Sequence, residues 1–138
     1  MKPIFSLPLT VSNEHIDSLQ HVNNEVYLRW ILKVVDAHSE SLGYPLSFFI
    51  QSGGCFVVRK HELNYLLPAH LGDELLLETW VTSLKAAQST RAYRIKRVRD
   101  DRVIFTAETV WVYIDLKTGR PMEIPSEMRE NYGRFLHE

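Results

Sequence analysis

The hydrophobic period of the sequence changes at one point, the glycine pair at 53–54. Before this pair, apolar residues recur at three- and four-residue spacing, which is typical of an amphipathic helix. After it, apolar and polar residues alternate in four long runs typical of β-strands, at 55–67, 73–84, 88–99 and 102–115. One helix cannot cover both faces of such a sheet, whereas an antiparallel sheet can bury a single face on it. The sequence therefore predicts an α+β domain in which a curved antiparallel sheet wraps around one helix.

The one long helix is predicted over residues 24–42. Asn23 or Asn24 can cap its N-terminus, and Gly43 suits the position just after its end. We expect the apolar stripe of this helix to face the core, and the stripe consists of Tyr27, Trp30, Ile31, Val34, Val35, His38 and Leu42.

Shorter elements are expected at both ends of the chain. Residues 4–11 are β-capable but contain Pro8, so they are predicted to form an edge or irregular strand. Residues 126–137 are predicted to form a short helix with Ser126 as its cap. The aspartate pair at 100–101 separates the last two strand runs and indicates a tight hairpin turn.

Composition and charge exclude several classes of function. The 138 residues suit a single domain over 1–138, and 16 Lys and Arg against 17 Asp and Glu give a net charge of −1. This balance argues against nucleic-acid binding, and no apolar run is long enough to span a membrane. The lone Cys55 excludes an internal disulfide and a cysteine-based metal site, so a reducing cytoplasm is the simplest compartment. No cofactor is expected.

The polar segment before the helix is the best candidate for chemistry. It gathers a carboxylate, Asp17, an imidazole, His21, and two carboxamides, Asn23 and Asn24, at a helix N-terminus. Free backbone N–H groups and the positive end of the helix dipole point to that position, so it can hold a developing oxyanion. Asp17 could then act as nucleophile or as general base, and His21 could assist proton transfer near neutral pH.

The run from Asp17 to Trp30, Asp-x-x-x-His-Val-Asn-Asn-x-x-Tyr-x-x-Trp, resembles a motif of the 4-hydroxybenzoyl-CoA thioesterase family of hotdog-fold proteins. In that family an Asp precedes a Tyr of the central helix by ten residues, as Asp17 precedes Tyr27 here. The motif is also similar to that of plant acyl-ACP thioesterases and related bacterial enzymes. A second stretch, from Phe56 to Leu75, resembles the strand–turn–strand that follows the helix in short-chain acyl-CoA thioesterases of the same family.

The resemblance implies a hotdog domain that pairs into a dimer, or a tetramer, with active sites at the subunit interface. It implies hydrolysis of an acyl thioester carried on coenzyme A or acyl carrier protein. By position, Asp17 takes the catalytic carboxylate and His21 the motif histidine. Leu19 stands where the plant motif has a catalytic Asn, which favours the mechanism with a single carboxylate.

Other residues are candidates for substrate binding, each beside a structural interpretation. Asn23 and Asn24 could contact substrate or only cap the helix, and Tyr27 could line an acyl pocket or belong to the core. Arg59, Lys60 and Arg91 could contact the phosphates of coenzyme A or an acidic carrier protein. Arg91 also belongs to a basic cluster that could instead be the solvated face of a strand, and the cluster consists of Lys85, Arg91, Arg94, Lys96, Arg97 and Arg99.

Two rival functions remain open at this stage. A non-catalytic hotdog module could bind acyl-CoA or a partner without hydrolysing it, because Leu19 replaces the plant-type Asn and Glu62 is only a loose candidate for a second carboxylate. A dehydratase on the same fold ranks lower, since its usual motif is missing. His15, Asp17 and His21 could also be metal ligands, but this interpretation is not favoured because their spacing matches no zinc pattern.

Overall fold

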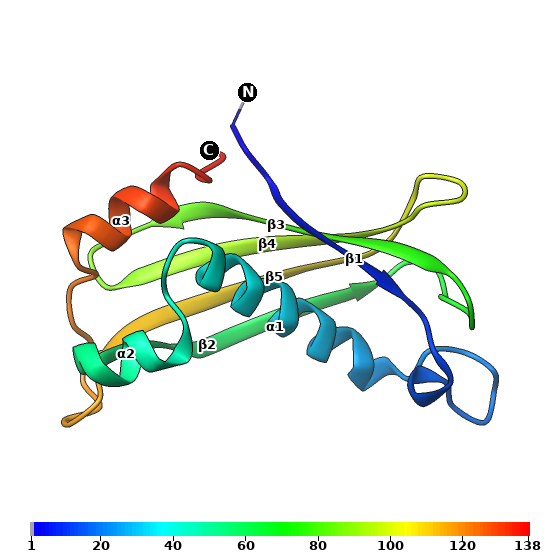
Figure 1. Ribbon diagram of the computed structural model, residues 1–138, viewed down its shortest axis with the longest axis horizontal. Coiled ribbons are helices and arrows are strands. Elements are labelled where there is room, and N and C mark those ends of the chain that lie inside the picture. Colours follow the sequence, from blue (N-terminus) through cyan, green and yellow to red (C-terminus); the bar gives the residue numbers. More distant parts are fainter. Residues whose placement is uncertain (1) are drawn as a thin grey trace.

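The structure, a computed structural model, describes residues 2–138 and has the expected α+β architecture (Figure 1). The strands curve around one long helix, as in a hotdog fold. The elements in chain order are β1 (Phe5–Thr10), the 3₁₀ turn η1 (Asn13–His15), α1 (Asn24–Ser41), α2 (Leu46–Ser52), β2 (Gly54–Tyr65), β3 (Glu74–Leu84), β4 (Gln88–Arg97), β5 (Arg102–Asp115) and α3 (Ser126–Gly133).

All neighbouring strands of the sheet are antiparallel, in the order β1-β3-β4-β5-β2. The N-terminal strand is therefore an edge, as predicted, and Pro8 is tolerated in it. The opposite edge is β2, so one side of this 12-residue strand has no partner strand among residues 2–138. Register shifts leave one extra residue each in β2, β3 and β5, namely Arg59, Thr82 and Ile104, and these bulges bend the sheet around the helix.

The part of the predicted stripe from Tyr27 to Val35 packs in the main core, whereas Leu42, just past the end of α1, packs against a second apolar cluster. Tyr27 and Trp30 are each 3% exposed, and the Tyr27 ring stacks on Phe105 of β5 with 5.0 Å between centroids. Burial of a large apolar side chain stabilises a fold by roughly 1.5–3 kcal/mol, so this stripe fixes α1 on the sheet. The core interpretation of both aromatic residues is confirmed. The inner face of β3 is buried too, through Leu75, Leu77, Thr79 and Val81.

The helices differ from the prediction in three details. The short helix α2 was not expected, and it packs Phe48 and Phe49 into a second apolar cluster around Tyr44 and Tyr132. The predicted Ser126 cap is wrong, because Pro125 occupies the cap position and makes no side-chain bond. The C-terminal helix also ends at Gly133 rather than 137. At the start of α1, Asn23 is the cap and accepts the Glu25 N–H at 3.3 Å.

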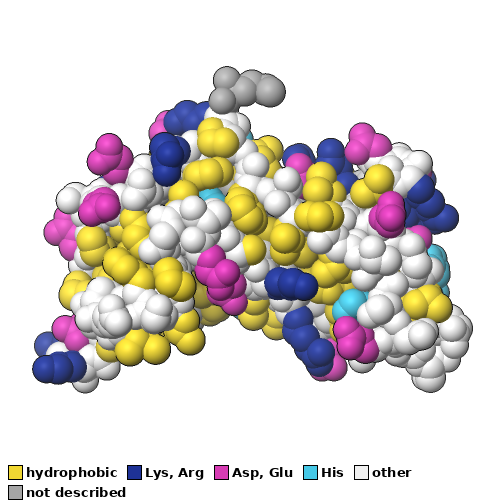
Figure 2. Space-filling model, in the orientation of Figure 1, with side chains coloured by type: hydrophobic (Ala, Val, Ile, Leu, Met, Phe, Trp, Pro, Cys, Tyr) yellow, Lys and Arg dark blue, Asp and Glu magenta, His cyan; other side chains and the backbone are white. Residues whose placement is uncertain are grey.

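The surface carries exposed apolar side chains beside the β2 edge and over α2 (Figure 2). Val57 and Val58 of β2 are 38% and 41% exposed, and Leu46 and Ile50 of α2 are 73% and 62% exposed. Among residues 2–138, no helix is both long and apolar enough to cross a membrane.

Candidate active site

Asp17 lies in a tight loop that its own carboxylate holds closed. The loop begins and ends in a bridge between Ile16 and Val22, and the Asp17 N–H donates to the His21 carbonyl at 2.9 Å. Asp17 Oδ1 accepts the backbone N–H groups of Leu19 at 2.9 Å and His21 at 3.3 Å. These bonds fix the carboxylate in one orientation and leave Oδ2 outside both of them. Oδ1 of Asp17 thus holds the loop, whereas Oδ2 takes part in neither of these two hydrogen bonds.

The Asp17 loop is anchored to the β2–β3 connection. The Val22 N–H donates to the Ala69 carbonyl at 3.2 Å, and the Ala69 N–H donates to the Tyr27 hydroxyl at 3.2 Å. Burial raises the pKa of Tyr27, so its phenol stays neutral. The ten-residue relation between Asp17 and Tyr27 therefore has a structural meaning: the tyrosine supports the segment that holds the Asp17 loop.

The first turn of α1 has a single N–H donor to spare. The Asn23 side chain accepts the Glu25 N–H, the Asn23 carbonyl accepts the Val26 N–H, and the Asn23 N–H donates to His15. Within residues 2–138, no hydrogen bond is present for the N–H of Asn24, the first helical residue. An anion at the positive end of this helix would meet that donor.

His21 is exposed on the Asp17 loop and faces a second imidazole. Its ring makes an edge contact with the His70 ring at 5.4 Å between centroids. His70 Nδ1 lies 3.9 Å from Asp73 Oδ2, and the His70 N–H donates to the same oxygen at 2.9 Å. Sequence reasoning missed His70 and Asp73 as site residues, although both lie in or beside the second motif. In the described part of the chain, no cluster of three or more potential metal ligands is present.

The basic candidates lie in two different environments. Arg59 and Lys60 are exposed at the bulge of the β2 edge. For Arg91 the alternative interpretation as part of a solvated strand face is wrong, because this residue is only 4% exposed and lies on the inner face of β4. Its terminal nitrogen Nη1 donates to His38 Nδ1 at 2.9 Å and to Thr79 Oγ1 at 3.2 Å.

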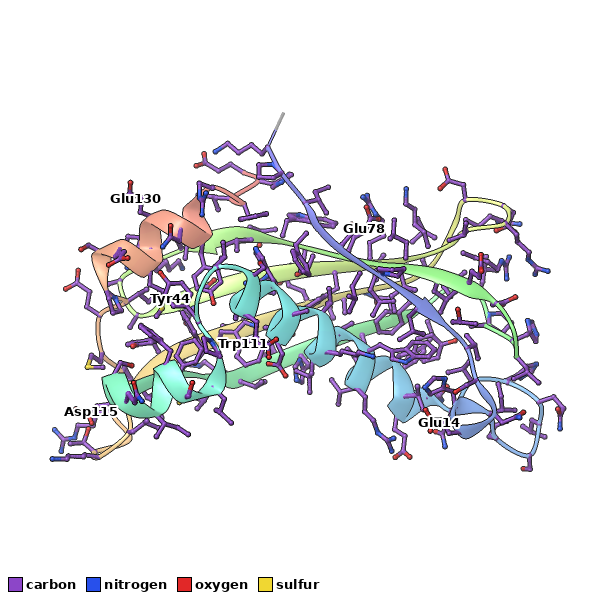
Figure 3. All side chains as sticks on the ribbon, in the orientation of Figure 1. Glu14, Tyr44, Glu78, Trp111, Asp115 and Glu130 are labelled. Atoms are coloured by element: carbon purple, nitrogen blue, oxygen red, sulfur yellow. The ribbon has the colours of Figure 1, made fainter. Side chains whose placement is uncertain are left out.

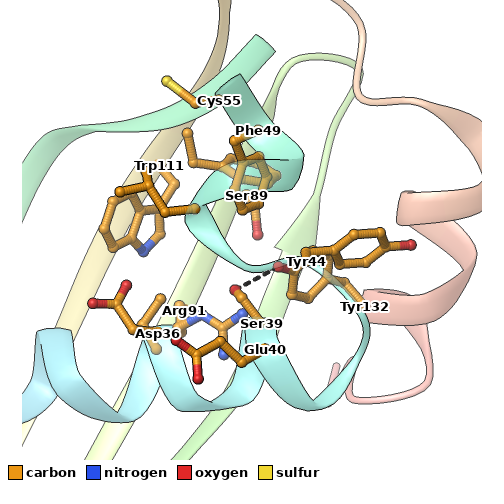
Figure 4. A pocket seen from close by; sticks show the side chains of 13 residues that line it. Asp36, Ser39, Glu40, Tyr44, Phe49, Cys55, Ser89, Arg91, Trp111 and Tyr132 are labelled. Carbon is orange, nitrogen blue, oxygen red and sulfur yellow. Dashed lines mark hydrogen bonds between the residues drawn. The ribbon is translucent and has the colours of Figure 1, made fainter. Parts of the chain in front are cut away.

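A cavity of about 450 Å³ opens between α1, α2 and the inner face of the sheet (Figure 4). Its walls are mainly apolar and include several aromatic rings, with polar groups from α1 and β4 on one side. The lining includes Tyr44, Phe49, Phe56, Trp111 and Tyr132 together with Asp36, Ser39, Glu40, Ser89 and Arg91. A cavity with an apolar body and a few polar groups is the usual form of a small-molecule site. Neither Tyr27 nor Trp30 lines it.

The Asp17 loop and the cavity lie at opposite ends of α1. In Figure 3, Glu14 beside the loop and Tyr44 at the cavity mark the two ends. At 1.5 Å per residue, the helix from Asn24 to Ser39 spans roughly 22 Å. A substrate that used both sites within one subunit would have to follow the whole helix.

Comparisons with known proteins point to one kind of chemistry. The family model described as the thioesterase-like superfamily matches residues 11–132. The chain is 30% identical over 130 residues to the long-chain acyl-CoA thioesterase FadM of Escherichia coli, covering 93% of this chain and 96% of that protein. It is 25% identical over 138 residues to the chloroplastic acyl-acyl carrier protein thioesterase ATL3 of Arabidopsis thaliana, covering 100% of this chain and 72% of that protein.

The solved structures include a neighbour of nearly the same shape. The protein SAV2348 of Staphylococcus aureus, solved in complex with CoA, superposes with a TM-score of 0.92 over 100% of this chain and 89% of that one. The sequence identity is 19%, so this likeness supports the fold alone.

Proposed function

The chain belongs to the thioesterase-like superfamily and is a thioesterase, and from this premise we propose that Asp17 is the catalytic carboxylate that hydrolyses an acyl thioester of coenzyme A or acyl carrier protein. The observation that carries the proposal is the geometry of the Asp17 loop. Asp17 is held through Oδ1, and the unengaged Asn24 N–H opens the helix that follows. The proposed compartment is a reducing cytoplasm, which suits the free thiol of Cys55.

In the proposed mechanism, the thioester carbonyl oxygen accepts the Asn24 N–H. Asp17 Oδ2 either attacks the carbonyl carbon or takes a proton from the water that attacks it. The first route expels the thiolate and leaves a mixed anhydride, which water then hydrolyses to the free acid. In both routes negative charge develops on the carbonyl oxygen, where one well-placed donor contributes about 3–4 kcal/mol to the transition state. His21 is proposed to orient substrate or water and to protonate the thiolate.

The edge strand β2 supports a dimer in which each site is shared. Tyr65 ends β2 and donates from its hydroxyl to the Asn24 carbonyl at 3.0 Å, whereas Cys55 and Phe56 begin β2 and line the cavity. Two-fold pairing of identical edges is antiparallel, so the end of one β2 would lie against the beginning of the other. The cavity of one subunit would then lie beside the Asp17 loop of its partner. The thioester would bind at the Asp17 loop of one subunit and the acyl group in the cavity of the other.

Thiol release from a panel of acyl-CoAs and acyl carrier proteins tests the proposal. Asp17→Asn should lower kcat by several orders of magnitude and leave the oligomer intact. The matched control is Asp101→Asn, the same change on an exposed hairpin residue with φ near 57°, a conformation that Asn also tolerates. Equal turnover by wild type and Asp17→Asn would disprove the role of this carboxylate. Binding of acyl-CoA without thiol release by the wild type would identify the non-catalytic module instead.

A further inference from the structure

Arg91 is a buried cation without a carboxylate partner. It is 4% exposed, and it belongs to none of the ion pairs among residues 2–138. Arg97 is similarly buried on the same strand, but it pairs with Asp100 at 2.8 Å. An uncompensated charge inside a protein is costly, and an apolar residue of similar size would normally be more stable in its place. The position of Arg91 therefore calls for a reason other than packing.

The neighbours of Arg91 do not neutralise its charge. His38 accepts a hydrogen bond from Nη1 and stays neutral, because burial and the Arg91 charge lower the pKa of His38 to about 3. The Tyr132 ring lies 5.5 Å from the guanidinium carbon, and this cation–π contact attracts the cation without cancelling its charge.

The unused donors of Arg91 are available to the cavity. Both contacts of the guanidinium, to His38 and Thr79, use Nη1, whereas a guanidinium carries five N–H donors over three nitrogens. Among residues 2–138, His38 Nε2 is the only side-chain nitrogen or oxygen that is both fully enclosed and without a hydrogen-bond partner. No nitrogen of Arg91 falls in that class. The Nε and Nη2 groups of Arg91 are thus not sealed away, and the cavity that Arg91 lines is the space they can reach.

The polar side of the cavity favours a neutral oxygen rather than an anion. Asp36, Ser39 and Glu40 of α1 line the same side of the cavity as Arg91 (Figure 4). Two of these side chains are carboxylates, so this wall of the cavity already carries acidic groups. Partial burial, and after it the neighbouring Glu40, raise the pKa of Asp36. A further carboxylate would be repelled. A hydroxyl could accept from Arg91 and donate to an α1 carboxylate at once.

We propose that Arg91 selects substrates whose acyl group carries a neutral oxygen, a hydroxyl or a carbonyl, remote from the thioester. The proposal rests on the thioesterase function above and deepens it. The aromatic walls receive the apolar body of the acyl group, and Arg91 donates to its oxygen. Arg91 is thus a specificity-determining residue rather than a contact for the carrier.

Matched pairs of substrates test this proposal. The pairs are CoA thioesters of eight, ten and twelve carbons, with and without a terminal hydroxyl, and kcat/KM is measured for each. At the matching chain length, wild type should favour the hydroxylated member by about tenfold or more, as expected for a hydrogen bond to a charged group. Arg91→Met should abolish the preference, and Arg91→Lys should retain part of it. Arg97→Met, the same change at a buried arginine on the same strand, should leave the preference unchanged.

Calorimetric binding of the corresponding free acids separates this inference from the proposed function. Selective, Arg91-dependent binding of hydroxylated acids without any thioester hydrolysis would support the inference and refute the thioesterase mechanism. Hydrolysis of all pairs without preference at any length would overturn the inference alone, as would a preference that persists in Arg91→Met. If Arg91→Met fails to fold, as judged by thermal unfolding, wild type and Arg91→Lys test the inference. A wild-type preference that is reduced in Arg91→Lys would support it, and a preference that is equal in both would overturn it.

Discussion

The Arg91 guanidinium lies 2.9 Å from Nδ1 of His38, and this contact fixes the tautomer of a fully buried imidazole. Because arginine can only donate, Nδ1 accepts and the proton of neutral His38 sits on Nε2, which has no partner among residues 2–138. The His38 ring also stacks on Phe5 and meets the edge of Phe135, with centroids 4.8 Å and 4.2 Å away. Protonation at this position would place a second cation beside Arg91.

The stability of the fold should therefore fall in mild acid. The pKa of His38 is lowered to about 3 in the folded chain, chiefly by burial and then by Arg91. Between pH 6.5 and pH 3 the unfolded chain binds a proton at this residue and the folded chain does not. The free energy of unfolding should decline by up to about 1.4 kcal/mol per pH unit from this group as pH falls, with no contribution above pH 7.

Urea unfolding of wild type and His38→Asn at pH 7, 5.5 and 4.5 measures this dependence. Asn keeps an acceptor for Arg91 but does not titrate, so the variant should show a shallower decline. Burial also lowers the pKa of His61, which is only partly buried, so His61→Asn should remove a smaller part of the slope. Equal slopes for wild type and His38→Asn would contradict the assignment.

The Asn23 cap offers a way to separate stability from catalysis. Asn23→Ala should cost about 1 kcal/mol of stability, because the Glu25 N–H loses its side-chain acceptor. Asn23→Asp keeps that acceptor and adds a charge that suits the helix dipole, so stability should be held or raised. The same charge would lie beside the proposed oxyanion position, and kcat should fall tenfold or more. Thermal unfolding measures the first effect and thiol release the second. An unchanged kcat in Asn23→Asp would disprove the proposal that the oxyanion forms at this helix end.

The β2 edge can be tested as the dimer interface with one charge. Val58→Lys places a cation on the inner face of the unpaired edge strand, and lysine on an edge opposes strand pairing. Sedimentation should show a monomer, and thiol release should be lost because each site would lack its partner's cavity. Val98→Lys is the matched control, since Val98 is also exposed and lies outside the strands, after β4. A Val58→Lys dimer with full activity would place the interface elsewhere.

Periodicity was enough to predict the strands and the central helix, because their apolar residues repeat with a regular spacing. The helix α2 has only seven residues, and its existence depends on the contacts of Phe48 and Phe49 with residues far along the chain. No local pattern reports such contacts. For the same reason, the closeness of His21 to His70 could not be predicted, since two separate loops create it.

The burial of Arg91 could have been predicted from the sequence. Alternate residues of a strand share a face, and Tyr93 and Ile95 are the apolar positions that mark the inner face of β4. Arg91 falls in the same alternation, so its side chain points inward as well. Grouping Arg91 with its basic neighbours Arg94 and Lys96 by charge alone hid this relation, because those two lie on the opposite face.

Two tyrosines beside the Asp17 loop should respond differently to loss of their hydroxyl groups. Tyr27→Phe leaves the N–H of fully buried Ala69 without its acceptor, which should cost about 1–3 kcal/mol of stability. Because the Ala69 carbonyl holds Val22, the Asp17 loop should loosen and kcat should fall more than KM changes. In Tyr65→Phe the freed acceptor is the carbonyl of exposed Asn24, which water can reach, so stability should change by less than about 1 kcal/mol. Urea unfolding and steady-state kinetics of the two variants check this contrast. Similar losses of stability and kcat in both variants would show that the Tyr27–Ala69 hydrogen bond does not hold the Asp17 loop in place.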